Sequence, residues 1–329
     1  MLSGRMWLRS STTAVARAAA PSSFALAPLR SFGAEITDVD LHAAASNGTL
    51  EGLANRLQAA LDAHGLLLVR GQFRLTASTQ IAVANLLGEI FPLPVRFQHA
   101  KSPHPNEILR ISNSESEGFK NIGTAGWHSD GTSYACPFGV SIMHIVSTPH
   151  RSAPTLFLPL SPLANRIRDS RPDWSRLWLE TNRRVGEPPV HHPLLYAHPR
   201  TRAPSVCLGK TYGLLWDGDG DALARRVAGA DEVDATLTEL HEHVTNFASA
   251  PGVVYRHEWR TGDLVLCDNL AVAHLAPPET QSPTEELGLR VLHRIVTAGV
   301  DPLVPLSDST RTRPRQAAPR RANQQSLDG

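Results

Sequence analysis

From about residue 107 to residue 297, the chain is a series of short apolar segments separated by loops rich in Pro, Gly and His. The segment 139–146 alternates with the two-residue period of a β-strand. Further strand candidates of this region are Thr155–Leu158, Ser205–Leu208, Val253–Glu258, Leu264–Cys267 and Leu289–Thr297. Helical patterns interrupt them at about 161–180 and 221–247. Many short strands with a few helices predict a mainly β fold, a sandwich or jelly roll with flanking helices.

The N-terminal third carries helical patterns instead. One apolar helical face consists of Leu50, Leu53, Leu57, Ala60 and Leu61. Gly65 follows it and is expected to end the helix in the left-handed backbone conformation. A second helical pattern runs from Ala77 to Leu87 and ends at Gly88. Between and before these helices, Leu66–Val69 is predicted as a buried strand and Ala34–Ile36 as a short one. No repeat of fixed period stands out, which argues against solenoids and propellers.

The composition is that of a soluble globular protein, with 41% hydrophobic and 19% charged residues. The 32 basic and 31 acidic side chains nearly cancel, so the charge suggests no nucleic-acid partner. No apolar run approaches the length of a membrane span. The three cysteines, Cys136, Cys207 and Cys267, lack CxxC spacing and suit a reducing compartment. A homo-oligomer is compatible with all of these features.

The two ends of the chain differ in composition from the middle. Residues 1–34 contain no acidic residue and four arginines among Ser, Thr and Ala, which predicts an organelle transit peptide over residues 1–29. Arg30-Ser31-Phe32 resembles a mitochondrial processing site. A plastid is the alternative address, and an ordinary disordered N-terminus would leave the protein in the cytoplasm. The folded domain is then expected over residues 30–306, followed by a disordered basic tail over residues 307–329.

A candidate metal site begins with Trp127-His128-Ser129-Asp130. In an extended segment, residues i and i+2 project to the same face, so His128 and Asp130 can converge on one ion. An imidazole and a carboxylate suit a divalent metal such as Fe(II). With 15 His and 31 acidic residues, however, such a pair also arises easily by chance.

A third ligand has to come from elsewhere in the fold. His274 follows Asp268-Asn269 after an apolar strand, at a point where the chain leaves the sheet. Such a position can direct a ligand into a cavity. Taken alone, His274 is better explained as a surface-loop histidine.

Two arginines lie on one face of the last predicted strand. Arg290 and Arg294 point the same way in an extended chain, whereas His293 points to the other side and is expected to be packed or paired. Burying two guanidinium groups is costly unless each one meets an anion. The alternatives are an inner strand that binds anions and an edge strand whose polar face lies in solvent, and the pattern alone does not separate them.

Taken together, these motifs resemble the taurine dioxygenase / 2,4-dichlorophenoxyacetate dioxygenase family of Fe(II)- and 2-oxoglutarate-dependent oxygenases. The resemblance runs from Phe32 to Gly299. The motifs that carry it are Phe32-Gly33-Ala34-Glu35-Ile36, Leu87-Gly88-Glu89, Trp127-His128-Ser129-Asp130, Pro154-Thr155-Leu156-Phe157, Asp268-Asn269 with His274, and Arg290-Val291-Leu292-His293-Arg294. The resemblance implies a double-stranded β-helix, which is a jelly roll with the metal inside its mouth.

The resemblance also implies a role for each motif residue. His128, Asp130 and His274 are expected to hold Fe(II), and O2 is expected to take an open metal position. Thr155 and Arg290 are expected to bind the far carboxylate of 2-oxoglutarate. Retention of the Asp130 carboxylate favours hydroxylation over halogenation, with release of succinate and CO2.

The substrate contacts follow from the same resemblance. Arg294 is expected to bind the anion of a small substrate, a carboxylate or a sulfonate; the alternative is a structural pair with a local carboxylate. Leu93 and Arg96 stand where the taurine enzymes have His and Tyr, and Thr124 stands where they have Asn, which argues against taurine itself. Arg96 and Thr124 remain candidate substrate contacts.

Two alternatives from other functional classes stay open at this point. Two histidines and an aspartate also suit catalytic Zn(II), so a zinc-dependent hydrolase is one of them. The other is a non-catalytic jelly roll that has kept its metal site.

Overall fold

The computed structural model describes residues 23–181, 186–217 and 225–306. Most of the predicted transit peptide and the whole predicted basic tail lie outside these residues. None of the described helices combines the length and the hydropathy that crossing a bilayer requires.

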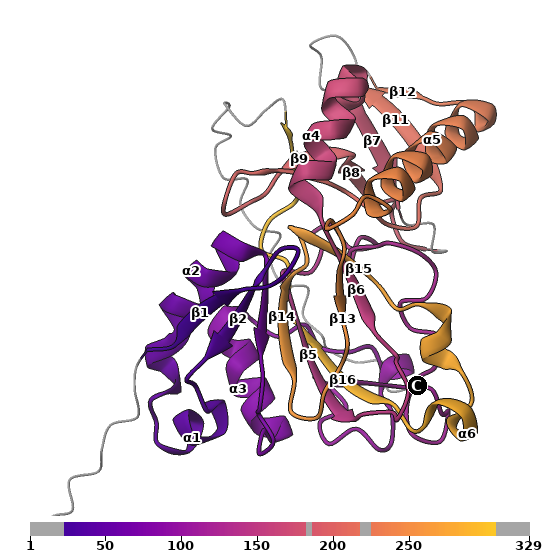
Figure 1. Ribbon diagram of the computed structural model, residues 1–329. Coiled ribbons are helices and arrows are strands. Elements are labelled where there is room, and N and C mark those ends of the chain that lie inside the picture. Colours follow the sequence, from indigo (N-terminus) through magenta and orange to yellow (C-terminus); the bar gives the residue numbers. More distant parts are fainter. Residues whose placement is uncertain (1–22, 182–185, 218–224, 307–329) are drawn as a thin grey trace, which may run out of the picture.

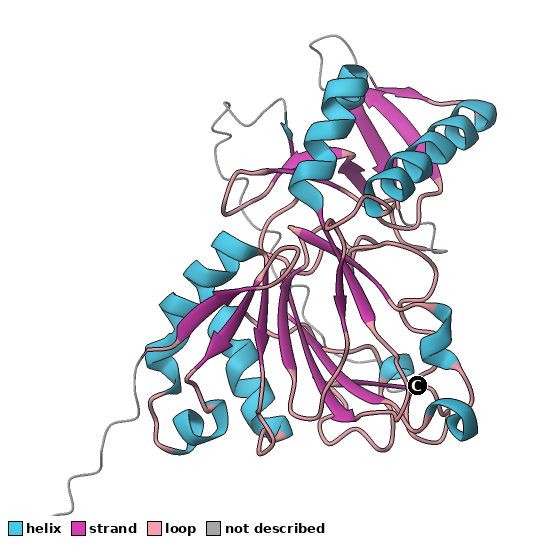
Figure 2. Ribbon diagram, viewed as in Figure 1, coloured by secondary structure: helices cyan, strands magenta, loops and turns pink. Residues whose placement is uncertain are grey.

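A seven-stranded sheet forms the centre of the molecule (Figures 1 and 2). In spatial order its strands are β1 (Ala25–Pro28), β2 (Ala34–Thr37), β3 (Leu66–Val69), β14 (Leu264–Asp268), β5 (Val140–Ser147), β16 (Val291–Val296) and β4 (Leu109–Ser112). Strands β2 and β3 pair in parallel, and the other neighbours are antiparallel. Because β16 lies between β5 and β4, it is an inner strand, and the edge-strand alternative for the two arginines is wrong.

A second, three-stranded sheet packs against the first. Its order is β13 (Tyr255–His257), β6 (Thr155–Pro159) and β15 (Val272–Leu275). Buried side chains from both sheets, among them Leu68, Met143 and Phe157, form one core cluster between them. Two facing sheets around a shared core are the architecture of a jelly roll, and the predicted fold class is confirmed.

Helices cover the other face of the large sheet (Figure 2). They are α1 (Leu41–Ser46), η1 (Leu50–Leu53), α2 (Ala54–His64) and α3 (Ala77–Leu87). Asp40 caps α1 by accepting from the Ala43 amide, and Gly65 ends α2 in the left-handed conformation at φ 71°. Their apolar faces, including Leu61 and Val83, pack on the sheet in a separate core cluster. The helices and strands predicted for this third of the chain are therefore confirmed.

The folded domain begins before residue 30. Strand β1 pairs with β2 from Ala25 opposite Thr37 to Pro28 opposite Ala34. The Phe24 side chain is only 6% exposed, and its carbonyl accepts a hydrogen bond of 2.8 Å from Arg56 Nη2. These contacts move the N-terminal boundary of the domain upstream of the one expected from composition.

The segment between β6 and β13 forms an additional unit at one end of the jelly roll (Figure 1). It contains α4 (Leu160–Ser170), η3 (Pro172–Arg176), β7 (Leu177–Glu180), β8 (His191–Pro193), β9 (Leu195–Ala197), β10 (Pro204–Val206), β11 (Gly213–Asp217), β12 (Arg225–Val227) and α5 (Ala230–Ala248). Its strands form two small sheets, and one of these also contains β17 (Val304–Pro305) near the end of the described chain. A core around the fully buried Trp174 holds the unit together.

Two sequence predictions for this unit need correction. The helix expected over 161–180 ends at Ser170, shortly before Pro172, because proline cannot continue the α-helical hydrogen bonds. The helix expected over 221–247 begins only at Ala230, after Gly229. The remaining short elements border the jelly roll. They are η2 (Val95–Phe97), η4 (Pro278–Gln281) and α6 (Thr284–Leu287).

Candidate metal centre

Backbone pairing brings the two histidines together. The His128 amide donates to the His274 carbonyl at 3.2 Å, and the His274 amide donates to the His128 carbonyl at 3.0 Å. The pair forms an isolated antiparallel bridge between the loop that carries His128 and strand β15. Their ring centroids lie 4.4 Å apart. Two residues far apart in the sequence thus present their imidazoles to one point.

Asn269 fixes the third member of the set. Its Oδ1 accepts from the Asp130 amide at 2.7 Å, and its Nδ2 donates to the Asp130 carbonyl at 2.9 Å and to the Phe138 carbonyl at 2.8 Å. Asn269 is fully buried. The sequence placed Asn269 in a motif without giving it a role. In the structure, its amide clamps the loop that carries Asp130.

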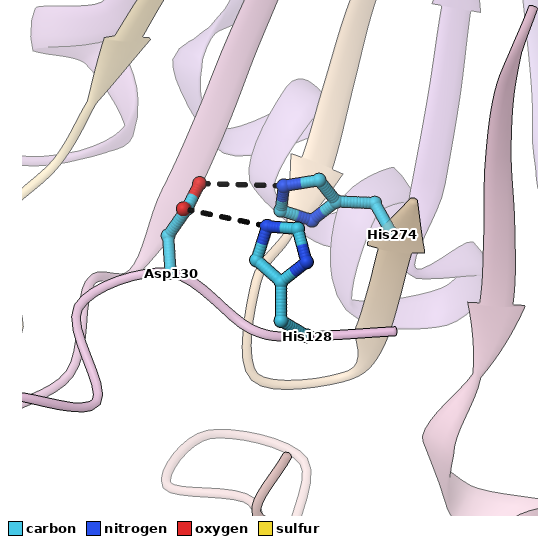
Figure 3. A group of neighbouring side chains, drawn as sticks. All are labelled: His128, Asp130 and His274. Atoms are coloured by element: carbon cyan, nitrogen blue, oxygen red, sulfur yellow. Dashed lines mark ion pairs between the residues drawn. The ribbon is translucent and has the colours of Figure 1, made fainter. Parts of the chain in front are cut away.

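The three side chains point toward one another, as Figure 3 shows. His128 Nε2 lies 3.9 Å from Asp130 Oδ1, and His274 Nε2 lies 3.4 Å from Asp130 Oδ2. One ligand atom from each residue can be chosen so that all lie within 4.8 Å of one another. His128 Nδ1 donates to the Gly126 carbonyl at 2.8 Å, which leaves Nε2 as the nitrogen with a free lone pair. Two imidazoles and one carboxylate fit a divalent iron site.

The electrostatics favour the forms that coordinate a metal. Burial lowers the pKa of His128 to about 4, and the neighbouring His274 acts in the same direction. For Asp130, burial alone would raise the pKa, but Arg294 and His274 outweigh it and hold the pKa well below its ordinary value. At neutral pH, His128 is therefore neutral and Asp130 is ionised, as metal binding requires.

Arg294 pairs with the carboxylate of Asp130. Its Nη1 donates to Asp130 Oδ2 at 2.8 Å, and both side chains are 12% exposed. Its Nε is buried and has no hydrogen-bond partner. The alternative expected from the sequence, a structural pair of Arg294 with a local carboxylate, is therefore observed for Nη1. The N–H group at Nε remains without a partner.

Arg290 and Thr155 line a narrow cavity of about 30 Å³ next to His274. The Arg290 side chain is buried, and no carboxylate of the described residues forms an ion pair with it. Its Nε also lacks a hydrogen-bond partner. Burial lowers the pKa of Arg290 to about 10, which still leaves the group cationic at neutral pH. A buried cation without a protein anion fits a ligand carboxylate.

Arg294 and Asp130 also line a larger cavity of about 250 Å³. Its walls are mostly apolar and include Phe91, Leu93, Phe97, Leu109, Ile122, Tyr134, Phe138 and Val296. The Phe91 ring lies 4.9 Å from the Tyr134 ring and 4.6 Å from the Phe138 ring, between ring centroids. The sequence prediction missed this aromatic cluster, although Phe91 closely follows the Gly-Glu motif and the other two follow Asp130.

The other two candidate substrate contacts predicted from the sequence, Arg96 and Thr124, differ in their position relative to the cavities. Arg96 lines the large cavity, and its guanidinium lies 5.1 Å from the Phe97 ring centroid. Thr124 lines neither of these two cavities, and its hydroxyl donates to the Asn121 carbonyl at 3.2 Å.

The profile of the "Taurine catabolism dioxygenase TauD, TfdA family" matches residues 23–295. The chain belongs to this family. The match starts at residue 23 and so includes β1, in agreement with the early start of the folded domain.

Curated TauD/TfdA relatives are similar over most of their length. The chain is 26% identical over 280 residues to the (S)-phenoxypropionate/alpha-ketoglutarate-dioxygenase of Sphingobium herbicidovorans, covering 78% of this chain and 90% of the relative. It is 25% identical over 297 residues to the alpha-ketoglutarate-dependent sulfate ester dioxygenase of Pseudomonas putida, covering 82% and 88%. A solved taurine dioxygenase from Burkholderia xenovorans superposes with a TM-score of 0.66 at 25% identity, covering 86% and 91%.

As a TauD/TfdA member, the protein is a 2-oxoglutarate-dependent dioxygenase that uses Fe(II) and O2. Family membership decides between the alternatives that the sequence left open, in favour of the oxygenase and against the zinc hydrolase and the non-catalytic jelly roll.

Proposed function

We propose that this dioxygenase hydroxylates a small organic anion with an apolar body. The observation that carries the proposal is the large cavity, whose lining combines apolar, partly aromatic walls with Arg294 and Asp130. A substrate that matches it has an anionic group for the arginine and a hydrocarbon or aryl portion for Phe91, Tyr134 and Phe138.

The chain's own residues would divide the work as follows. His128, Asp130 and His274 hold the iron, and Asn269 keeps the Asp130 loop in place. When bound, iron and 2-oxoglutarate together activate O2 for oxidation of a C–H bond, with release of succinate and CO2. The apolar walls exclude water from the reacting groups.

Arg290 and Thr155 would hold the far carboxylate of 2-oxoglutarate. The guanidinium is buried without an ion pair to a carboxylate of the described residues, and Thr155 lines the same cavity. A planar guanidinium pairs with a carboxylate in a bidentate way, and a hydroxyl can occupy a remaining oxygen lone pair.

The substrate anion would take the unused donors of Arg294. Its Nε has no protein partner, and the side chain also lines the large cavity. Relatives named for phenoxypropionate, 2,4-dichlorophenoxyacetate and sulfate esters are consistent with an anion attached to an apolar body. Leu93 in the cavity wall offers no hydrogen bond to a small zwitterion, so taurine is not the expected substrate.

Succinate release in the presence of Fe(II), 2-oxoglutarate and O2 tests this proposal. The substrates compared are an aryloxyalkanoic acid, an alkyl sulfate, taurine and the uncharged amide of the same aryloxy acid. We expect the acid to exceed its amide by about tenfold or more in kcat/KM, because hydrogen bonds to charged groups contribute about 1.5–3 kcal/mol. Equal turnover of acid and amide would contradict an anionic substrate, and turnover of taurine alone would contradict an apolar one.

We also propose a mitochondrial location, supported by the Arg-containing, acid-free sequence of residues 1–34. The full chain with a C-terminal fluorescent tag is expected to reach mitochondria, and a chain without residues 1–22 is not. N-terminal sequencing of the imported protein is expected to give a start at or before Phe24, because cleavage at Arg30-Ser31-Phe32, the site expected from the sequence, would remove the buried Phe24 side chain and β1. A plastid or cytosolic signal from the full chain would contradict the location.

A further inference from the structure

We infer that Trp259 is a positioning residue that directs the Thr155 hydroxyl toward 2-oxoglutarate. This inference rests on the proposed role of Thr155 and Arg290 as the pocket for the far carboxylate. Trp259 has no part in the metal set and lines neither of the two cavities next to it.

The contact between the two side chains is a buried hydrogen bond. Trp259 Nε1 donates to Thr155 Oγ1 at 2.9 Å, and the residues are 7% and 4% exposed. An indole N–H can only donate, so the threonine oxygen has to be the acceptor. Among the described residues, Thr155 Oγ1 makes no other hydrogen bond.

The direction of the hydroxyl proton follows from this contact. Because the indole N–H occupies one lone pair of Oγ1, the O–H bond has to point away from Trp259, and Thr155 borders the cavity that Arg290 also lines. A hydroxyl without such a partner could also turn a lone pair toward the ligand carboxylate, which would be repulsive. The indole N–H therefore favours the orientation in which Thr155 donates to the same anion as the guanidinium.

The fold gives Trp259 little freedom to move away. On the paired strands, His257 stands opposite Thr155, and Trp259 follows two residues later, just after β13 ends. The Trp259 ring meets the His257 ring edge-on, with centroids 4.4 Å apart at 85°. His257 is fully buried, with Nδ1 3.0 Å from the Tyr255 hydroxyl and Nε2 3.3 Å from Asp263 Oδ2. These contacts of His257 hold the Trp259 indole in place.

The experiment compares Trp259→Phe with the wild-type enzyme, because phenylalanine keeps an aromatic ring and removes the N–H. We expect KM for 2-oxoglutarate to rise about threefold to tenfold, the value of one net hydrogen bond, with kcat at saturating 2-oxoglutarate within about twofold. The matched variants are Thr155→Val and the double variant Trp259→Phe/Thr155→Val. The double variant is expected to bind 2-oxoglutarate no more weakly than Thr155→Val alone.

A second cosubstrate separates positioning from general structural damage. In 2-oxovalerate, a methyl group replaces the far carboxylate, so Trp259→Phe is expected to leave KM for 2-oxovalerate unchanged. If Trp259→Phe does not fold, Trp259→Met serves the same comparison. An equal rise of KM for both cosubstrates, or an unchanged KM for 2-oxoglutarate, would overturn the inference. Absence of 2-oxoglutarate binding to the wild-type enzyme with Fe(II) would instead refute the proposed function itself.

Discussion

We predict that the Arg290 guanidinium lowers the free energy of unfolding of the ligand-free protein but increases the affinity for 2-oxoglutarate. Its guanidinium is buried, and burial lowers its pKa to about 10 from an ordinary value of 12.5. A lowered pKa of a base means that the charged form is less stable in the folded than in the unfolded protein. At 1.36 kcal/mol per pKa unit, the cost is roughly 3 kcal/mol throughout the neutral range.

The substitution Arg290→Met removes this charge and keeps an unbranched apolar side chain. The two backbone contacts of the residue, with Asn113 Oδ1 at 2.9 Å and Ser112 Oγ at 2.8 Å, do not involve the guanidinium. We therefore expect the free energy of unfolding of the metal-free protein to rise by about 1–3 kcal/mol, less than the full cost because methionine packs imperfectly. The affinity for 2-oxoglutarate should change in the opposite direction and fall about 100-fold or more, since two charge-assisted hydrogen bonds are lost.

Urea unfolding of the metal-free protein measures the first effect. The weak visible absorption of the anaerobic complex with Fe(II), titrated with 2-oxoglutarate, measures the second. Arg290→Lys is the matched control: it keeps a charge but loses the planar fork, so its affinity should be intermediate. A loss of about 2 kcal/mol or more of stability in Arg290→Met would refute the reasoning, because it would mean that the guanidinium already has a stabilising partner without ligand.

The remaining predictions concern the metal loop, the N-terminal strand and acid stability. Asn269→Ala should lower the free energy of unfolding by about 2–4 kcal/mol and weaken Fe(II) binding about 10-fold to 100-fold, because buried backbone groups lose their partners; unchanged metal affinity would contradict the clamp. A chain that starts at residue 30 should unfold about 2–3 kcal/mol more easily in urea than one that starts at residue 23, because Phe24 and β1 are lost; equal stabilities would contradict a structural role for β1. Burial lowers the pKa of His293 to about 3 and that of His144 to about 4. Both are neutral in the fold, so their stabilising contribution is complete above about pH 6.5 and falls by up to roughly 1.4 kcal/mol per pH unit for each histidine as the pH drops toward 4. Urea midpoints at pH 7, 6 and 5 measure this loss, and His293→Gln should reduce it; an unchanged pH profile in that variant would count against His293 as a source.

Local patterns predicted the elements of the jelly roll well. Leu66–Val69 is a strand with those bounds, and Gly65 ends the preceding helix in the left-handed conformation. His293 was expected to be packed or paired, and in the structure its Nε2 lies 2.8 Å from Arg110 Nη1. These features depend on side-chain period and backbone conformation within a few residues, which a sequence carries directly.

The unit between β6 and β13 was predicted less well for a physical reason. Several of its strands, such as β8 and β9, have only three residues, too few to display a two-residue period. His191 and His192, for example, fall in none of the predicted strands, although both lie in β8 and pair with β7. Strand β1 was overlooked because its four exposed residues carry no alternation and lie in a segment with the composition of a transit peptide.

The sequence by itself determined which chemical groups the site contains. Extended geometry placed His128 and Asp130 on one face, and the spacing of Arg290 and Arg294 placed two cations on another. Tertiary structure decided the rest, because the remaining choices depend on contacts between residues distant in the chain. The backbone bridge selected His274 as the partner of His128, and the position of β16 between two strands buried the arginines. Only the packed fold shows that Arg294 contacts Asp130 and that Arg290 meets no carboxylate among the described residues. It also shows that the indole N–H of Trp259 donates to the Thr155 oxygen.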